Sequence, residues 1–150
     1  MKRSILYVSI SILSIWQLFS LTSCEIETHA KGNIDGNWHL EQIDTLETGG
    51  SKDIRENRIF WGIQANLVQL RSYYDPENIY ILRFSKTDKT FQLYEPRVND
   101  REKHDPAVTD VTLLNPYGIN ELQESFQIEK LSGSKLILKS AKLRLHFETF

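Results

Sequence analysis

The sequence predicts an all-β domain, a small antiparallel up-and-down barrel of about eight strands. Short segments in which apolar and polar residues alternate recur along residues 35–150, and turn signals separate most of them. No segment there has helical periodicity beyond a turn or two. A two-sheet sandwich fits the same pattern. A barrel would pair the first strand with the last and so remove both edges of the sheet.

Residues 1–23 form a predicted signal peptide. Lys2 and Arg3 precede an apolar run at residues 5–19 that only small polar residues and one glutamine interrupt. An uncleaved transmembrane helix is the alternative. It is weaker because residues 5–21 are at the short edge of the roughly 17 to 25 residues that span a bilayer, and serines dilute the run.

The leader ends in Leu21-Thr22-Ser23-Cys24, which resembles the bacterial lipobox. This resemblance implies that the lipoprotein signal peptidase cuts before Cys24 after the thiol has been joined to diacylglycerol. Acylated Cys24 would then hold the mature chain on a membrane. Glu25 follows the cysteine, whereas aspartate at that position favours inner-membrane retention in Gram-negative bacteria. We therefore expect a lipid-anchored protein of the cell envelope, in the outer membrane, on either its periplasmic or its outer face.

Residues 24–34 are predicted to form the acylated N-terminus and a polar tether, which reaches at most about 35 Å. Removing 23 of 150 residues leaves 127, with 16 basic and 20 acidic side chains and a net charge of −4. That length suits one domain, at residues 35–150. An acidic chain has no general attraction for nucleic acid. Because the only cysteine is acylated, packing alone must stabilise the fold.

The domain begins with a predicted strand at residues 37–44, in which Trp38 and Leu40 point to one face. Two glycines and a charged segment follow at residues 49–57. We expect a long, mobile connection there.

The next apolar segment, residues 59–70, alternates as a strand does, but its phase changes partway. We interpret this change as one long strand with a bulge near residues 66–68 or a bend at Gly62. A helix over residues 58–72 is the alternative, because glutamine, leucine and alanine are frequent there.

The clearest predicted hairpin occupies the middle of the chain. Residues 73–78 contain an Asp-Pro turn signal, residues 79–84 alternate, and a polar turn at residues 85–89 leads into an apolar strand at residues 91–93. Charges crowd residues 95–106, which are typical of a solvated loop.

Residues 108–114 alternate weakly and predict a short strand, and residues 119–124 suit one helical turn with Glu121 and Glu124 exposed. Three closely spaced strands end the chain, at residues 125–131, 135–139 and 142–149. The last of these is expected to lie beside residues 37–44.

Gly36-Asn37-Trp38 matches the Gly-x-Trp motif at the start of the first lipocalin strand. With the lipobox and the eight-strand plan, the chain resembles the lipocalin-like lipoproteins of the Bacteroidetes type. The resemblance implies that Gly36 and Trp38 close one end of the barrel. Two weaker matches follow: Thr109-Asp110-Val111 is similar to the second lipocalin motif, and Arg144 to the arginine that packs on the tryptophan.

No catalytic or phosphate-binding motif is present in the sequence, so we expect no enzyme and no cofactor. The four histidines are scattered, and His39 and His146 are expected on the outer face of the first and last strands. Two histidines are too few for a metal site, so none is expected.

Two functions remain, of which the first is the one expected and the second is the alternative. In the first, the barrel holds a small hydrophobic or amphipathic ligand, as the lipocalin resemblance implies, at an apolar wall that includes Trp61, Tyr80, Leu82, Phe84 and Phe91. The Trp61 N–H and Tyr80 are the candidate polar contacts. In the second, side chains fill the barrel, and its surface docks an envelope protein as an accessory or inhibitory subunit.

Overall fold

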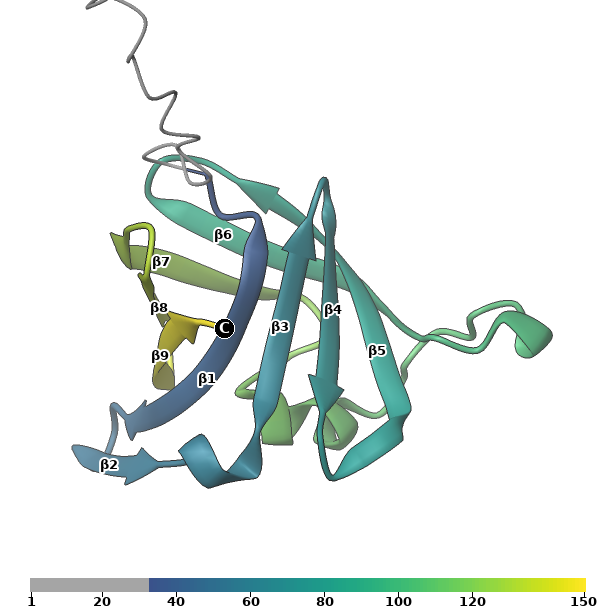
Figure 1. Cartoon of the computed structure of the whole chain (residues 1–150), viewed down its shortest axis with the longest axis horizontal. Coiled ribbons are helices and arrows are strands. Elements are labelled where there is room, and N and C mark those ends of the chain that lie inside the picture. The colour runs from purple at the N-terminus through teal and green to yellow at the C-terminus, as the bar shows by residue number, and fades with distance from the viewer. Residues whose placement is uncertain (1–32) are drawn as a thin grey trace, which may run out of the picture.

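The computed structural model describes residues 33–150 and shows a closed antiparallel β-barrel (Figure 1). The predicted signal peptide, Cys24 and most of the predicted tether lie outside the described residues. None of the helical segments within residues 33–150 has the length and apolar character needed to cross a bilayer.

The sheet has nine strands: β1 Gly36–Thr45, β2 Gly50–Asp53, β3 Ile59–Gln64, β4 Leu67–Ser72, β5 Asp75–Lys86, β6 Thr90–Val98, β7 Glu124–Leu131, β8 Lys135–Lys139 and β9 Leu143–Thr149. Three short 3₁₀ helices lie between them: η2 Arg55–Asn57, η3 Arg101–Lys103 and η4 Val111–Tyr117. Eight strands form the closed wall, and β2 extends the sheet beside the second half of β1.

The barrel closes where β1 meets β9, as the sequence predicts. The two strands pair from Trp38 opposite Thr149 to Thr45 opposite Leu143, with a bulge between Leu40 and Gln42. Pairing of these two strands removes both free edges of the eight-strand wall. A barrel, and not a sandwich, is therefore the architecture.

The inward side of the barrel wall is mainly apolar and buried. All the residues that the sequence places on that side are buried except Ile128 and Leu143, which are half-buried. The core comprises Ile34, Trp38, Leu40, Ile54, Ile59, Trp61, Ile63, Val68, Leu70, Tyr80, Leu82, Phe84, Phe91, Leu93, Val108, Leu114, Tyr117, Ile119, Phe126, Leu136, Leu138, Leu145 and Phe147.

The predicted single strand at residues 59–70 is wrong, and so is the helical alternative. Strands β3 and β4 form a hairpin with a two-residue turn at Ala65 and Asn66. Ile63 pairs with Val68 across the turn, and this reversal produces the change of phase. Ala65 takes a positive φ of 57°. Two-residue hairpin turns usually contain Asn-Gly or Asp-Gly, and this sequence has neither at residues 65–66.

The predicted mobile connection at residues 49–57 is instead ordered structure. Strand β2 pairs with β1, and Ile54 is buried with its N–H donating to the Glu41 carbonyl at 2.8 Å. The turn expected at residues 73–78 is shorter, because β5 already begins at Asp75. The hairpin of β5 and β6 confirms the prediction for residues 79–93.

The predicted strand at residues 108–114 is wrong, because η4 begins at Val111. Asp110 caps this helix by accepting hydrogen bonds from the N–H and the hydroxyl of Thr112, at 2.9 and 2.6 Å. The helical turn expected at residues 119–124 is absent, since residues 119–123 are irregular and β7 starts at Glu124. Figure 1 shows the green η4 turns at the lower end of the barrel.

The charged segment between β6 and η4 projects away from the barrel as an exposed loop around η3 (Figure 1). This confirms the solvated loop, although β6 runs to Val98 and takes the first residues of the predicted range.

Candidate functional site

The five residues predicted to contact an internal ligand all lie inside the barrel, and protein atoms surround them. Trp61 has no exposed surface, and its ring packs edge-on against Phe126 and Phe147, with centroids 6.1 and 5.0 Å away. Phe84 packs on Phe91 with centroids 4.9 Å apart. The ring faces and edges that an internal ligand would contact are therefore already packed against other side chains of the barrel.

The predicted polar contacts are also engaged by the protein. The Trp61 N–H donates to the Tyr117 carbonyl at 3.2 Å. Tyr80 packs edge-on against the Tyr117 ring at 5.8 Å, and burial raises the pKa of the Tyr80 hydroxyl. Burial likewise raises the pKa of Tyr117 to about 12, so both phenols stay neutral in any physiological medium.

The η4 segment fills the lower end of the barrel. Leu114, Tyr117 and Ile119 are buried, and the Tyr117 hydroxyl donates to the Asn78 carbonyl at 3.3 Å. Gly118 has a φ of 84°, and a Cβ there would lie 2.6 Å from the Leu145 side chain. Only glycine therefore allows this close approach between β9 and the end of the η4 segment, which we call the η4 plug.

The two residues expected to close the other end occupy the start of β1. Trp38 has no exposed surface, which confirms its predicted burial, and its N–H donates to the Ile34 carbonyl at 2.8 Å. Gly36 pairs with Ile63 of β3. Ile34 is itself buried, so the segment before β1 covers the same region of the core.

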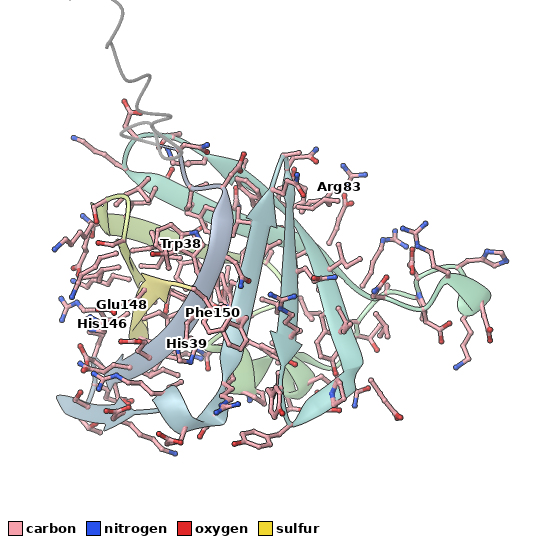
Figure 2. All side chains as sticks on the ribbon, viewed as in Figure 1. Trp38, His39, Arg83, His146, Glu148 and Phe150 are labelled. Carbon is pink, nitrogen blue, oxygen red and sulfur yellow. The ribbon has the colours of Figure 1, made fainter. Side chains whose placement is uncertain are left out.

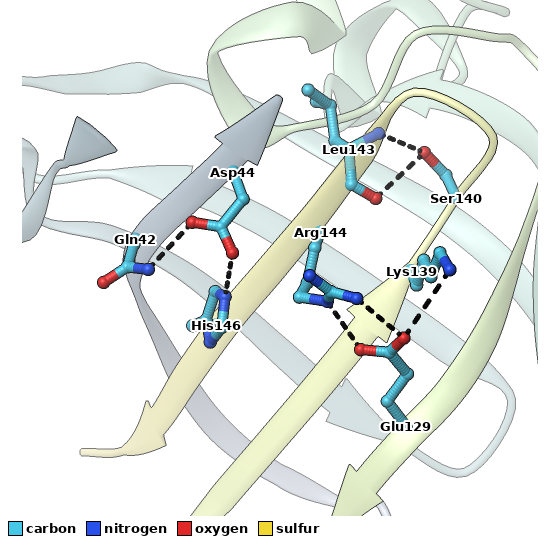
Figure 3. Close-up of polar contacts among 8 residues, drawn as sticks. All are labelled: Gln42, Asp44, Glu129, Lys139, Ser140, Leu143, Arg144 and His146. Carbon is cyan, nitrogen blue, oxygen red and sulfur yellow. Dashed lines mark hydrogen bonds and ion pairs between the residues drawn. The ribbon is translucent and has the colours of Figure 1, made fainter. Parts of the chain in front are cut away.

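Arg144 does not pack on Trp38, so the predicted match to the lipocalin arginine is wrong. Its guanidinium lies on the outer face and donates to both carboxylate oxygens of Glu129, at 2.6 and 3.1 Å (Figure 3). Alternation along β9 explains this, because Leu145 points inward. The Arg144 hydrogen bonds hold the pKa of Glu129 below its usual range.

A second polar contact on this face joins the two closing strands. His146 Nε2 lies 2.7 Å from Asp44 Oδ2, and Gln42 donates to Asp44 Oδ1 at 2.8 Å (Figure 3). Partial burial raises the pKa of Asp44, but hydrogen bonds from His146, Gln42 and Ser51 outweigh burial and leave the pKa lowered. We interpret this network as a structural clasp, since no three metal-ligating side chains converge within residues 33–150.

Glu124 is 5% exposed, which contradicts the predicted exposed carboxylate. As the first residue of β7 its side chain points inward, and Oε2 accepts the Asn120 N–H at 2.6 Å. Burial raises the pKa of Glu124, against the opposing hydrogen bonds from Asn120 and Ser140. No sequence pattern indicated this burial, because the segment before β7 resembled an exposed helical turn.

Four hollows, with volumes of about 270 to 620 Å³, open to solvent on the outer surface of the described chain, and none of these four is lined by Trp61, Tyr80, Leu82, Phe84 or Phe91. The largest lies over β1, β3 and β4. We call it the arginine–aromatic hollow, and its lining residues are His39, Arg55, Glu56, Arg58, Phe60, Arg71, Ser72, Tyr73 and Phe150.

Aromatic rings form one wall of this hollow. His39 stacks on Phe60 with centroids 4.9 Å apart and planes at 23°, and Phe150 meets Phe60 edge-on at 4.9 Å. Figure 2 shows Phe150 beside His39 on the outside of the barrel. The Phe150 N–H donates to the Asn37 carbonyl at 2.9 Å, which holds its ring over β1. His39 and His146 are both on the outer face, as expected, but His39 stacks on Phe60 whereas His146 contacts Asp44.

Arginines form the other wall. The Arg71 guanidinium lies 5.6 Å from the Phe60 ring, and that of Arg58 lies 4.9 Å from the Tyr73 ring. Within residues 33–150 neither arginine forms an ion pair. No sequence pattern indicated this site, because its residues come from β1, β3, β4, η2 and the end of the chain and are ordinary surface residues along the sequence.

Comparisons with known proteins agree with this architecture. A family model described as a lipocalin-like domain matches residues 19–150. A crystal structure of a lipocalin-like protein from Bacteroides uniformis superposes with a TM-score of 0.59 at 19% identity, over 77% of this chain and 97% of that one. An uncharacterized protein from Bacteroides eggerthii superposes with a TM-score of 0.58 at 16% identity, over 79% and 100% of the two chains. Among curated proteins, none is significantly similar to the sequence.

Proposed function

This chain belongs to the lipocalin-like domain family, and from that premise we propose that it is a membrane-anchored binding protein of the cell envelope that recognises its ligand on the outside of a filled barrel. Acylated Cys24 would supply the anchor, most simply in the outer membrane. The observation that carries the proposal is the occupied interior, where the five candidate ligand contacts are buried among protein side chains and line none of the four surface hollows.

The width of an eight-stranded barrel supports an interior filled by side chains. A barrel of about eight strands is only just wide enough to be filled by its own side chains. Here five of the largest fully buried side chains are aromatic, namely Trp38, Trp61, Phe91, Phe126 and Phe147. The η4 plug closes the lower end, and the Ile34–Trp38 contact covers the other. An internal ligand would have to displace several of these contacts.

The surface supplies the binding features that the interior lacks. Tyr73, Tyr74 and Phe150 are 62%, 66% and 83% exposed, and two of them border the arginine–aromatic hollow. That hollow, at about 620 Å³, is within the range of roughly 300 to 1,000 Å³ typical of ligand sites. Docking of an envelope protein remains the second candidate, because exposed aromatics are also frequent at protein interfaces.

Fluorescence of Trp61 tests the filled interior. The full chain is titrated with uncharged apolar ligands, namely N-phenyl-1-naphthylamine and long-chain alcohols, and the expected result is no saturable change in emission. Phe126→Ala serves as the positive control, because it removes a ring beside Trp61 and leaves a void that accepts such molecules. Saturable quenching of the wild-type chain that is lost in Trp61→Phe would place the ligand inside and overturn the proposal.

A further inference from the structure

We propose that the arginine–aromatic hollow binds a small monoanionic carboxylate with an aromatic or bulky apolar body. This inference rests on the proposed function, which places recognition outside the barrel, and it adds the site and the chemical class of the ligand. Unpaired arginines, an aromatic wall and the paired strands that carry both favour this class of ligand.

The hollow contains two arginines that form no ion pair with other described residues. Arg55 is compensated by Glu41 and Asp53, whose oxygens lie 3.3 and 3.5 Å from its guanidinium. Arg58 and Arg71 have no acidic partner within residues 33–150, and Glu56 is the one acidic side chain that lines the hollow. Arg58 and Arg71 therefore present guanidinium donors that no carboxylate side chain of the described residues occupies. The negative charge of Glu56 would repel a phosphate dianion more strongly than a monoanionic carboxylate.

The guanidinium group also favours carboxylates by shape. Its planar donors match the two oxygens of a carboxylate, so one arginine can donate two parallel hydrogen bonds. The Arg71 Nη2 atom already donates to Asn37 Oδ1 at 2.7 Å, which orients the group beside the Phe60 ring. Its remaining donors are available to a ligand.

The aromatic wall defines the rest of the ligand. His39, Phe60 and Phe150 form a continuous cluster, and Tyr73 lies under the Arg58 guanidinium. A flat or bulky apolar group can pack on these rings, which are otherwise exposed to water at Tyr73 and Phe150. Fully hydrophilic anions such as acetate gain nothing from this wall, so they should bind much more weakly.

Strand pairing holds the two walls in place. His39 pairs directly with Phe60 across β1 and β3, and Phe60 pairs with Arg71 across β3 and β4. Three neighbouring strands thus present a histidine, a phenylalanine and an arginine in one row on the outer face. A preformed row of this kind loses little side-chain entropy when a ligand binds.

Isothermal titration calorimetry of the full acylated chain in detergent micelles tests the proposal, with the same titration into empty micelles as the blank. The probes share one ring system: 2-naphthoate carries the carboxylate, 2-naphthylmethanol is neutral, and 2-naphthyl phosphate carries more negative charge. We expect saturable binding of one 2-naphthoate per chain, with the alcohol about tenfold weaker and the phosphate no tighter than the carboxylate.

Variants assign the binding to the hollow. Arg71→Gln and Arg58→Gln should each weaken 2-naphthoate binding by about tenfold, and Phe60→Leu should weaken all three probes alike. Glu56→Gln should tighten binding by about threefold, a gain that loss of folding cannot produce. Arg83→Gln is the matched control, because Arg83 pairs with Glu95 and does not line the hollow.

Two results would overturn the proposal. One is the absence of saturable 2-naphthoate binding by the folded chain, and the other is binding that Arg71→Gln, Arg58→Gln and Glu56→Gln leave unchanged. Neither result bears on the filled barrel, which the Trp61 titration tests separately. Quenching of Trp61 by uncharged ligands would instead refute the proposed function and leave the affinity of the hollow as a separate measurement.

Discussion

The indole N–H of Trp61 on β3 donates a hydrogen bond to the backbone carbonyl of Tyr117, 56 residues further along the chain, at 3.2 Å. This bond joins the barrel wall to the η4 plug at the point where an internal ligand would enter. It satisfies a buried polar group that would otherwise cost free energy. In this member of the lipocalin-like family, the η4 segment of the chain itself closes the lower end of the barrel.

Removing the plug side chain should expose the interior. Tyr117→Ala in a Trp38→Phe background should increase quenching of Trp61 fluorescence by acrylamide and lower the free energy of unfolding by about 3 kcal/mol, because a buried ring is lost. Leu113→Ala is the control on the same helix, where the side chain is 45% exposed. Equal quenching in the two variants would show that Tyr117 does not shield Trp61.

Trp38 should be among the most important residues for stability. Trp38→Ala should lower the free energy of unfolding by about 3 to 5 kcal/mol, as expected for a fully buried aromatic side chain. Trp38→Phe keeps most of the buried ring surface but loses the hydrogen bond to Ile34, worth about 1 kcal/mol. Urea unfolding measures both, with exposed Tyr74→Ala expected within about 0.5 kcal/mol of wild type.

Glu124 should make stability fall as the pH rises. Its pKa in the folded protein is raised by burial above the ordinary value of 4.5, so the folded state holds the proton more tightly than the unfolded state. Stability from this group is complete below that value and is lost as the pH rises through the folded pKa. Glu124→Gln should therefore gain stability relative to wild type between about pH 4 and about pH 7, measured by urea unfolding.

Glu129 should change the stability with pH in the opposite direction to Glu124, as the same urea-unfolding experiment can measure. The Arg144 hydrogen bonds lower its pKa below 4.5, so its stabilisation is present above that value and is lost as the pH falls through the folded pKa. Glu129→Gln should lose stability relative to wild type as the pH rises toward about 4.5, and the difference should stay constant at higher pH. Identical trends in the two variants would contradict the burial of Glu124 as the cause.

Acylation at Cys24 remains a prediction from the lipobox. Expression in a Gram-negative host, membrane fractionation and mass spectrometry should give a chain that starts at diacylated Cys24. Cys24→Ala should block both cleavage and membrane retention. Recovery of an unmodified chain in the soluble fraction would exclude the anchor and, with it, the proposed envelope location.

The barrel itself was largely predictable, because alternation of apolar and polar residues directly reports which side of a strand is buried. Strands 37–44, 135–139 and 142–149 were expected from that pattern, as was the pairing of the first with the last. The errors fell where local signals were missing. The Ala65-Asn66 turn lacks glycine, so the β3–β4 hairpin looked like one strand with a shifted phase.

By itself, the sequence determined the fold class, the inward face and the buried Trp38, because these follow from the period of the strands and one short motif. Only the tertiary structure decided that η4 occupies the barrel end, that Glu124 is buried and that Arg71 lies beside Phe60 without forming an ion pair to a described residue. Each of these depends on distances between residues remote in the chain, which strand register and barrel closure set. No local pattern records them, since a side chain's partners come from neighbouring strands and not from neighbouring residues.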